Sequence, residues 1–123
     1  MIQFIQNRSF LRWIPGRQGS GYEKMLLIQA KKPLTFDLYL LRYRPGSYIS
    51  WHKDPVKGYK HFRLNLFLKK SKVGGIFETK NPVILDHTRL QLFRPDINEH
   101  RVTEIQGNTR YVLSLGWLWG ESD

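Results

Sequence analysis

The chain has 123 residues, a length that suggests one domain with one modest core. Apolar residues make up 41% of it and aromatic residues 14%, which argues against a disordered chain, and no apolar run is long enough for a transmembrane helix. It has no cysteine, which excludes disulfides, thiolate metal sites and cysteine nucleophiles and fits a cytoplasmic location.

The charge balance favours polyanionic partners. Lys and Arg number 20 against 10 acidic residues, which gives a net charge of +10. Such an excess favours association with nucleic acid, anionic lipid or acidic proteins. No single block of Lys and Arg dominates, however, so a basic but otherwise ordinary surface explains the excess equally well.

Residues 22–32 fit either a short helix or a strand, with a strand favoured, and from residue 34 onward the pattern predicts strand after strand. Residues 14–21 contain Pro and Gly and are expected to form a loop. A hairpin through "QGN" is expected to place the strand that holds His100 beside the last strand. About eight short strands at this spacing favour an all-β sandwich or an open barrel. The predicted strands cover residues 22–32, 34–43, 47–54, 61–69, 74–79, 82–85, 89–95, 99–105 and 109–119.

His52 and Asp54 lie two residues apart in the strand predicted over 47–54. Successive strand side chains point to opposite faces, so these two point the same way. Burying two ionisable groups together is unfavourable unless they are paired or bind a metal. A lone His-x-Asp is weak evidence, and His52 by itself is better explained as a core histidine.

His100, late in the chain, changes that balance. With the earlier pair it makes two histidines and one carboxylate, the set that holds non-haem Fe(II) on one face and leaves three coordination positions open. Arg110 follows ten residues later, on a strand that is largely apolar on both faces. A guanidinium offers a planar fork of donors suited to a carboxylate. The alternative is an outward Arg110 paired with Glu99 or Glu104.

The other two histidines are expected to be surface or turn residues rather than metal ligands. His61 starts a predicted strand, and His87 lies in the turn "LDHTR". Asp86 and His87 lack a third partner at a sensible spacing for a second metal site.

These motifs resemble the Fe(II)/2-oxoglutarate-dependent dioxygenases, whose fold is the double-stranded β-helix, a jelly-roll or cupin-like barrel. The stretch "RYRPGSYISWHKDP" resembles the segment of prolyl hydroxylases in which a Tyr and a Gly turn precede His-x-Asp. The stretches "HFRLNLFLKK" and "LFRPDINEHRV…TRYVLSLGW" are similar to the aspartyl/asparaginyl β-hydroxylases. The resemblance implies one domain over 1–123, with an N-terminal extension over 1–33 and a catalytic barrel core over 34–119.

The resemblance also implies a role for each matching residue in a hydroxylation that uses O₂. His52, Asp54 and His100 are the implied ligands of Fe(II), and Arg110 is implied to pair with the distal carboxylate of 2-oxoglutarate. For Tyr43 a core position is a nearly equal alternative, and for Arg63 and Asn65 contact with substrate or structural water is the alternative. The weaker implied co-substrate contacts are Tyr43, Arg63, Asn65 and Ser114.

The substrate is less well indicated. The nucleic-acid demethylases of this superfamily carry a second Arg six residues after the first, where this chain has Gly116. A bare barrel with Lys53, Lys57 and Lys60 near its mouth suggests a large, acidic substrate. A protein side chain is the first expectation and a nucleic acid the second. A cupin-like module that binds metal without turnover is the rival, but it gives no reason for Arg110. No membrane partner and no particular oligomeric state is indicated.

Overall fold

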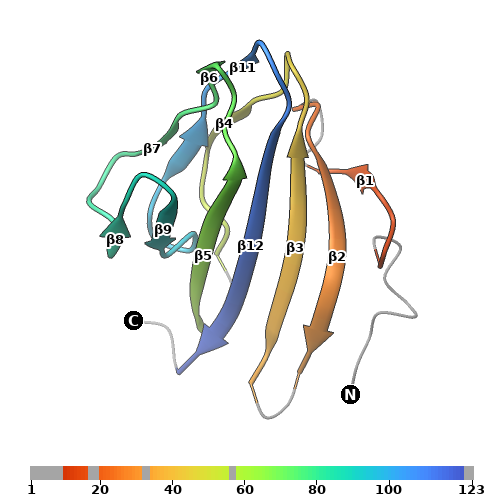
Figure 1. Cartoon of the computed structure of the whole chain (residues 1–123). Helices are drawn as coiled ribbons and strands as arrows, with labels where there is room; N and C mark the ends of the chain where they lie inside the picture. The colour runs from red at the N-terminus through yellow and green to blue at the C-terminus, as the bar shows by residue number, and fades with distance from the viewer. Residues whose placement is uncertain (1–9, 17–19, 32–33, 56–57, 121–123) are drawn as a thin grey trace.

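The computed structural model describes residues 10–16, 20–31, 34–55 and 58–120. These residues form no helix and fold into three antiparallel sheets, which confirms the prediction of an all-β chain (Figure 1). None of them belongs to a helix long and apolar enough to cross a membrane.

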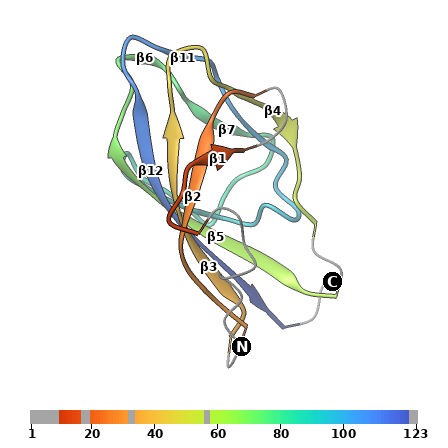
Figure 2. The ribbon, with the colours of Figure 1, turned by 90° about the vertical axis from the view of Figure 1, so that its right-hand side faces the viewer.

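The larger sheet has the strand order β1-β2-β3-β12-β5-β9-β8. Its strands are β1 (Ile14–Pro15), β2 (Glu23–Ala30), β3 (Phe36–Tyr43), β5 (Lys60–Lys69), β8 (Leu85–Asp86), β9 (Leu90–Phe93) and β12 (Arg110–Trp119). The smaller sheet has the order β4-β10-β7, and a third pair joins β11 to β6. Their strands are β4 (Ile49–His52), β6 (Val73–Gly74), β7 (Phe77–Thr79), β10 (His100–Val102) and β11 (Ile105–Gln106). Figure 2 shows β4 set apart from the larger sheet, behind it in the view of Figure 1.

The core lies between the two sheets, where period-two alternation directs every second side chain of the long strands. On β12, Arg110, Val112 and Ser114 point inward and are buried, whereas Leu113 and Leu115 point outward and are only half-buried. The same alternation on β5 turns Asn65 and Phe67 inward. The packed cluster is Tyr43, Ile49, Phe67, Val102, Ile105 and Val112.

The hairpin expected between the strands of His100 and Arg110 is wrong. β10 pairs with β4 and β7, whereas β12 pairs with β3 and β5, so the two strands belong to different sheets. The chain crosses between the sheets at Ile105, which is fully buried and exchanges backbone hydrogen bonds with Ser47 and Gly46. Burial of this side chain holds the chain at the point where it passes between the sheets, so β10 and β12 do not form a hairpin.

Most other strand predictions are confirmed, with shorter strands than expected. The strand expected over 82–85 is wrong except at Leu85, because Pro82 has no N–H to donate to a ladder. The loop expected over 14–21 contains the two-residue strand β1. Residues 17–19 of that loop lie outside the described part of the chain. Lys32, at the end of the strand expected over 22–32, lies outside it too. β2 comes from the expected N-terminal extension and pairs along its length with β3.

Candidate functional site

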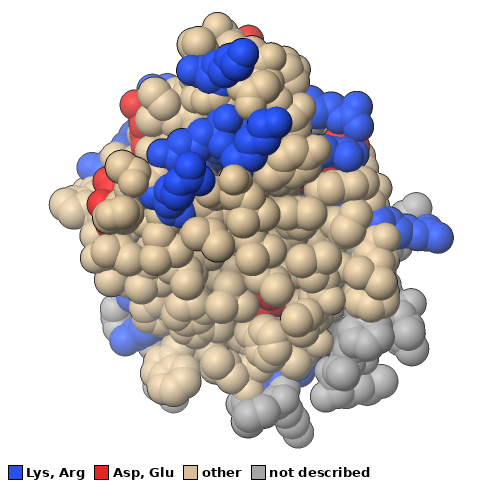
Figure 3. Space-filling view, viewed as in Figure 1, with Lys and Arg blue, Asp and Glu red and all other residues tan. Residues whose placement is uncertain are grey.

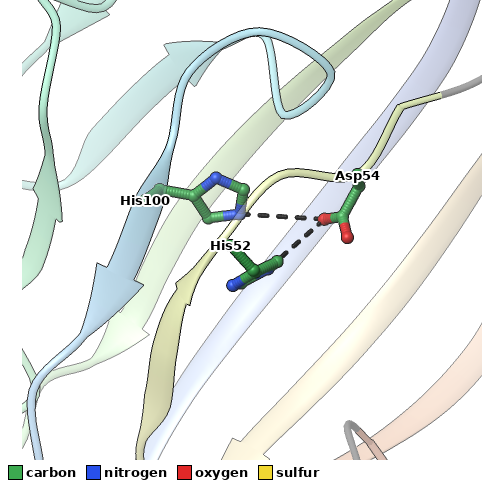
Figure 4. Close-up of side chains that lie close together, drawn as sticks. All are labelled: His52, Asp54 and His100. Carbon is green, nitrogen blue, oxygen red and sulfur yellow. Dashed lines mark ion pairs between the residues drawn. The ribbon is translucent and has the colours of Figure 1, made fainter.

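His52, Asp54 and His100 meet at one end of the smaller sheet (Figure 4). The pairing of β4 with β10 sets His52 opposite His100. The chain then leaves β4, and the Asp54 N–H donates to the Pro95 carbonyl at 2.6 Å, which places the carboxylate beside both rings. Asp54 Oδ2 lies 3.4 Å from His52 Nε2 and 3.7 Å from His100 Nε2. One ligand atom of each residue therefore lies within 4.8 Å of the other two.

Both imidazoles are oriented by a backbone carbonyl two residues earlier. His52 Nδ1 lies 2.7 Å from the Ser50 oxygen, and His100 Nδ1 lies 2.7 Å from the Asn98 oxygen. A carbonyl can only accept, so each Nδ1 carries the proton and each Nε2 keeps its lone pair for a metal. Carbonyl partners of this kind orient metal-binding histidines. A core histidine would not explain why two such lone pairs converge on one carboxylate.

All eight residues that the sequence singled out for the site line one cavity of about 380 Å³. The metal candidates come from the smaller sheet, and the others come from the inner faces of β3, β5 and β12 in the larger sheet. The structure thus brings the implied ligands and the implied co-substrate contacts together, and the individual roles remain predictions. The eight are Tyr43, His52, Asp54, Arg63, Asn65, His100, Arg110 and Ser114.

Arg110 is the most unusual group in this cavity. Its side chain is buried, and its guanidinium carbon lies 4.8 Å from the ring centre of Tyr43 and 4.9 Å from that of Phe67. Nη1 is buried without a hydrogen-bond partner, and no carboxylate of the described residues is within ion-pair distance of the guanidinium. Buried cations are normally paired, so this one calls for an anion that the described chain does not supply.

The ionisation of Tyr43 does not supply that anion. Burial raises the pKa of Tyr43 above its usual value, and the positive charge of Arg110 opposes the shift only in part. Burial likewise lowers the pKa of Arg110, and its interaction with Tyr43 opposes that shift. The phenol therefore remains neutral near pH 7, and the guanidinium remains a cation without a counter-charge.

Arg63 is held in a different way. Its Nη2 donates to Asp37 Oδ1 at 2.8 Å, and its Nη1 donates to Ser114 Oγ at 2.9 Å. A Cβ at Gly116 would overlap this guanidinium, so glycine at that position makes room for Arg63. The departure noted in the sequence at Gly116 thus has a structural consequence: the space beside the backbone of β12 is filled by an arginine from β5.

The structure corrects one sequence prediction about histidines and leaves another in place. His61 was expected at the surface or in a turn, but its half-buried side chain lines the cavity, where burial and the nearby Arg63 lower its pKa. Its strand begins at Lys60, so period-two alternation with Arg63 and Asn65 was the signal that could have found it. His87 is exposed in its turn, as predicted.

Several lining residues were not singled out from the sequence. Most of them, although not Tyr22, are strand residues, and their residue types gave no chemical reason to single them out. Lys57, expected near the mouth, lies outside the described residues. The additional lining residues include Tyr22, Lys24, Tyr39, Leu41, Phe77 and Phe93.

Comparisons with known proteins identify the fold. No protein-family model matches the chain, and no curated protein matches it by sequence. Among solved structures, a prolyl-4-hydroxylase from Pseudomonas putida is similar over 98% of this chain and 81% of its own, with 17% identity and a TM-score of 0.66. A viral collagen prolyl hydroxylase from Paramecium Bursaria Chlorella virus-1, solved as a 2OG complex, is similar over 81% of this chain and 80% of its own, with 14% identity and a TM-score of 0.61.

A cupin 2 conserved barrel domain protein from Rhodopseudomonas palustris is also similar, over 90% of this chain and 72% of its own, with 11% identity and a TM-score of 0.57. Hydroxylases and cupins thus share this architecture with the chain, which confirms the predicted jelly-roll, cupin-like fold. The likeness alone does not separate enzymes from non-enzymes, because one fold carries many functions.

We predict that the three converging donors bind one divalent cation. Replacing His100 with Ala should weaken Co(II) binding by about 100-fold or more, because a site of three ligands loses one of them and with it the facial geometry. His87→Ala is the matched control, since His87 is exposed in a turn and should leave the affinity unchanged. Titration followed by the visible spectrum of Co(II) measures both. Equal affinities in the two variants would contradict a metal centre at this place.

We also predict that Arg110→Met stabilises the ligand-free protein by about 1–3 kcal/mol, because it replaces an uncompensated buried charge with an apolar side chain of similar length. Arg63→Met should instead destabilise it, because it removes the partner of Asp37. Urea unfolding of both variants tests the difference. A loss of stability in Arg110→Met would show that the guanidinium has a structural counter-charge.

Proposed function

We propose that this chain is an Fe(II)- and 2-oxoglutarate-dependent dioxygenase that hydroxylates a macromolecular substrate, with a protein side chain as the favoured target. The observation that carries the proposal is a single cavity with two complementary features: a His-Asp-His cluster on one wall and, on the other, a buried Arg110 whose Nη1 has no hydrogen-bond partner and which has no carboxylate partner among the described residues. A prolyl hydroxylase of similar fold, solved as a 2OG complex, supports the same assignment.

The donor set of the cluster fits iron. Two imidazole nitrogens and one carboxylate oxygen are the ligands of non-haem Fe(II) oxygenases, and no thiolate is present to favour a softer metal. When bound, Fe(II) and 2-oxoglutarate supply the activation of O₂, and the protein supplies binding and orientation. His52, Asp54 and His100 would hold the metal, and the carbonyls of Ser50 and Asn98 keep both imidazoles in the tautomer that can do so.

Arg110 fits one end of the co-substrate. A dicarboxylic keto acid carries a free carboxylate at the end away from its keto group, and a guanidinium binds such a group through two parallel hydrogen bonds. The rings of Tyr43 and Phe67 hold the guanidinium in place from the flanks, so little side-chain freedom is lost on binding. The orphan Nη1 then gains an acceptor, and the buried charge is neutralised.

The inner wall of the larger sheet would position the rest of the co-substrate. Asn65 is buried with Oδ1 unpartnered, and Ser114 is fully buried while accepting from Arg63. Phe77 and Phe93 pack beside His100, with ring centres 5.8 and 5.0 Å from it. These apolar rings exclude water from the protein side of the metal cluster, which strengthens every electrostatic contact inside the cavity.

The opposite side of the cluster is open, which suits a large substrate. The side chain of Asp54 is 41% exposed, whereas those of His52 and His100 are 10% and 7% exposed. Lys53 beside it is exposed, and Lys24 lines the cavity with its ammonium 5.3 Å from the ring of Tyr39. These cations and the net charge of +10 favour an acidic peptide over a neutral one.

The first test is the affinity for 2-oxoglutarate in the Mn(II)-loaded protein, measured by calorimetry. Arg110→Ala should weaken binding about 100-fold, because a charge-assisted bidentate contact is lost, and Arg110→Lys should recover part of it. Arg44→Ala is the matched control, since Arg44 is exposed and outside the cavity. Equal affinity in the wild type and Arg110→Ala would refute the assigned role, and no binding to the wild type would favour a metal-binding module without turnover.

The second test concerns the substrate. Peptides rich in Asp and Glu around a central Pro, Asn or Asp should increase the release of succinate from 2-oxoglutarate, and Lys53→Glu should reduce that increase because it removes attraction at the mouth. Single-stranded oligonucleotides are the comparison. Stimulation by oligonucleotides alone, with an affinity that falls steeply as the salt concentration rises, would show that the substrate is a nucleic acid and not a protein side chain.

A further inference from the structure

The two faces of the larger sheet differ in polarity, and the usual arrangement of an apolar inner face and a polar outer face is reversed. Its inner face carries the polar and charged groups of the cavity, and its outer face is apolar. Strand register aligns the outward side chains in rows that run across the strands. One row is Met25, Leu40, Leu113, Leu66 and Leu90. The next is Ile28, Leu38, Leu115, Leu64, Leu92 and Leu85.

These two rows, which we call the leucine rows, contain no polar residue and face away from the core. None of their members is buried, and Ile28, Leu66 and Leu85 are 49%, 38% and 42% exposed. Figure 3 shows the result, a broad face over β5, β12, β3 and β2 with few charged side chains and with Lys and Arg gathered toward its upper end. Monomeric soluble proteins rarely expose a contiguous apolar patch of this extent, and such patches mark interaction sites.

A further row flanks the leucine rows at each end. At one end Glu23, Arg42, Tyr111 and Lys69 lie side by side, and Arg42 is paired with Glu23 at 2.9 Å. At the other end Phe36, Trp117 and Phe62 do so, with Phe62 and Trp117 stacked at 5.7 Å between ring centres and the Arg94 guanidinium 5.5 Å from the ring centre of Phe62. The outer face therefore runs from a charged end, through the leucine rows, to an aromatic end.

We propose that the outer face of the larger sheet binds a second copy of the same chain, forming a symmetric face-to-face dimer. Strands about 4.8 Å apart and rows about 6.7 Å apart give the four rows a projected area of roughly 550 Å². The relief of the side chains raises the accessible area above this projection, toward the roughly 800 Å² per partner of a stable interface. This dimer rests on the sheet face alone and does not depend on the function of the cavity.

The order of the rows selects one orientation of the copies. A two-fold axis along the strands would set the charged end of one copy on the charged end of the other, which would remove charged groups of both copies from water. An axis across the strands, between the leucine rows, instead exchanges the two ends. Lys69 of one copy then lies over the aromatic end of the partner, and Leu113 lies over the partner's Leu115. The face is self-complementary in this orientation, as a two-fold interface requires.

The test is the mass of the full chain in solution, measured by sedimentation equilibrium from about 1 to about 100 µM. The wild type should be a dimer that does not grow further. Leu66→Glu should raise the dissociation constant at least about 10-fold, because each interface then buries two unpaired carboxylates. Ile76→Glu is the matched control, with the same change in charge at a 58% exposed residue outside the four rows, and should leave the dimer intact.

Circular dichroism checks that each variant is folded, and Ile28→Glu replaces Leu66→Glu if that variant is not. A wild type that stays monomeric at the highest concentration overturns the proposal and assigns the face to a different partner. A mass that rises beyond the dimer, or a Leu66→Glu variant that dimerises as the wild type does, overturns it as well.

Discussion

A buried guanidinium with no counter-charge among the residues that the structure describes is the constraint on which the candidate site depends. Removing a charge from water is unfavourable by several kcal/mol even after relaxation, so such a group persists only where binding of an anion compensates for it. Arg110 occupies this position at the start of β12, fixed between two aromatic rings and facing a cavity whose opposite wall carries the His-Asp-His cluster. A metal-binding barrel with no co-substrate would gain nothing from this arrangement, whereas a site that must bind a dicarboxylic acid depends on it.

The polar cavity also explains why the inner face of the larger sheet is polar and its outer face is apolar. Its inner face is occupied by polar and charged groups that line the cavity, among them Arg63, Asn65 and Ser114, and these leave only a small apolar core between the sheets. The leucine rows on the outer face hold the larger apolar surface. Covering that surface with a second copy would supply hydrophobic stabilisation that a core of this size cannot, because small domains bury a modest fraction of their surface. The proposed active site and the proposed dimer interface thus lie on opposite faces of one sheet.

Much of this architecture could be predicted from the sequence, for identifiable reasons. Alternation on β5 and β12 gave the faces of Arg63, Asn65 and Arg110, because period two is a local property of a strand. The same alternation predicted that His52 and Asp54 lie together, but β4 ends at His52, and the hydrogen bond of the Asp54 N–H to Pro95 places the carboxylate instead. The partnership of β10 with β4 could not be predicted, because it depends on which sheet the chain joins after Ile105, and a short sequence such as "QGN" favours a local hairpin equally well. The inward position of His61 could have been found from its alternation with Arg63 and Asn65, whereas the filling of space at Gly116 by Arg63 is a tertiary fact with no local signal of its own.

The measurement that tests the central claim most directly is an anaerobic titration of the purified chain with Fe(II) and then with 2-oxoglutarate, followed by visible absorption. A charge-transfer band forms only when the keto acid chelates a metal that the protein already holds, so it reports the cluster and the co-substrate pocket together. The account predicts a band that saturates at one equivalent of each and is absent in His52→Ala. Folded wild-type protein that binds Fe(II) but develops no band with 2-oxoglutarate would contradict it.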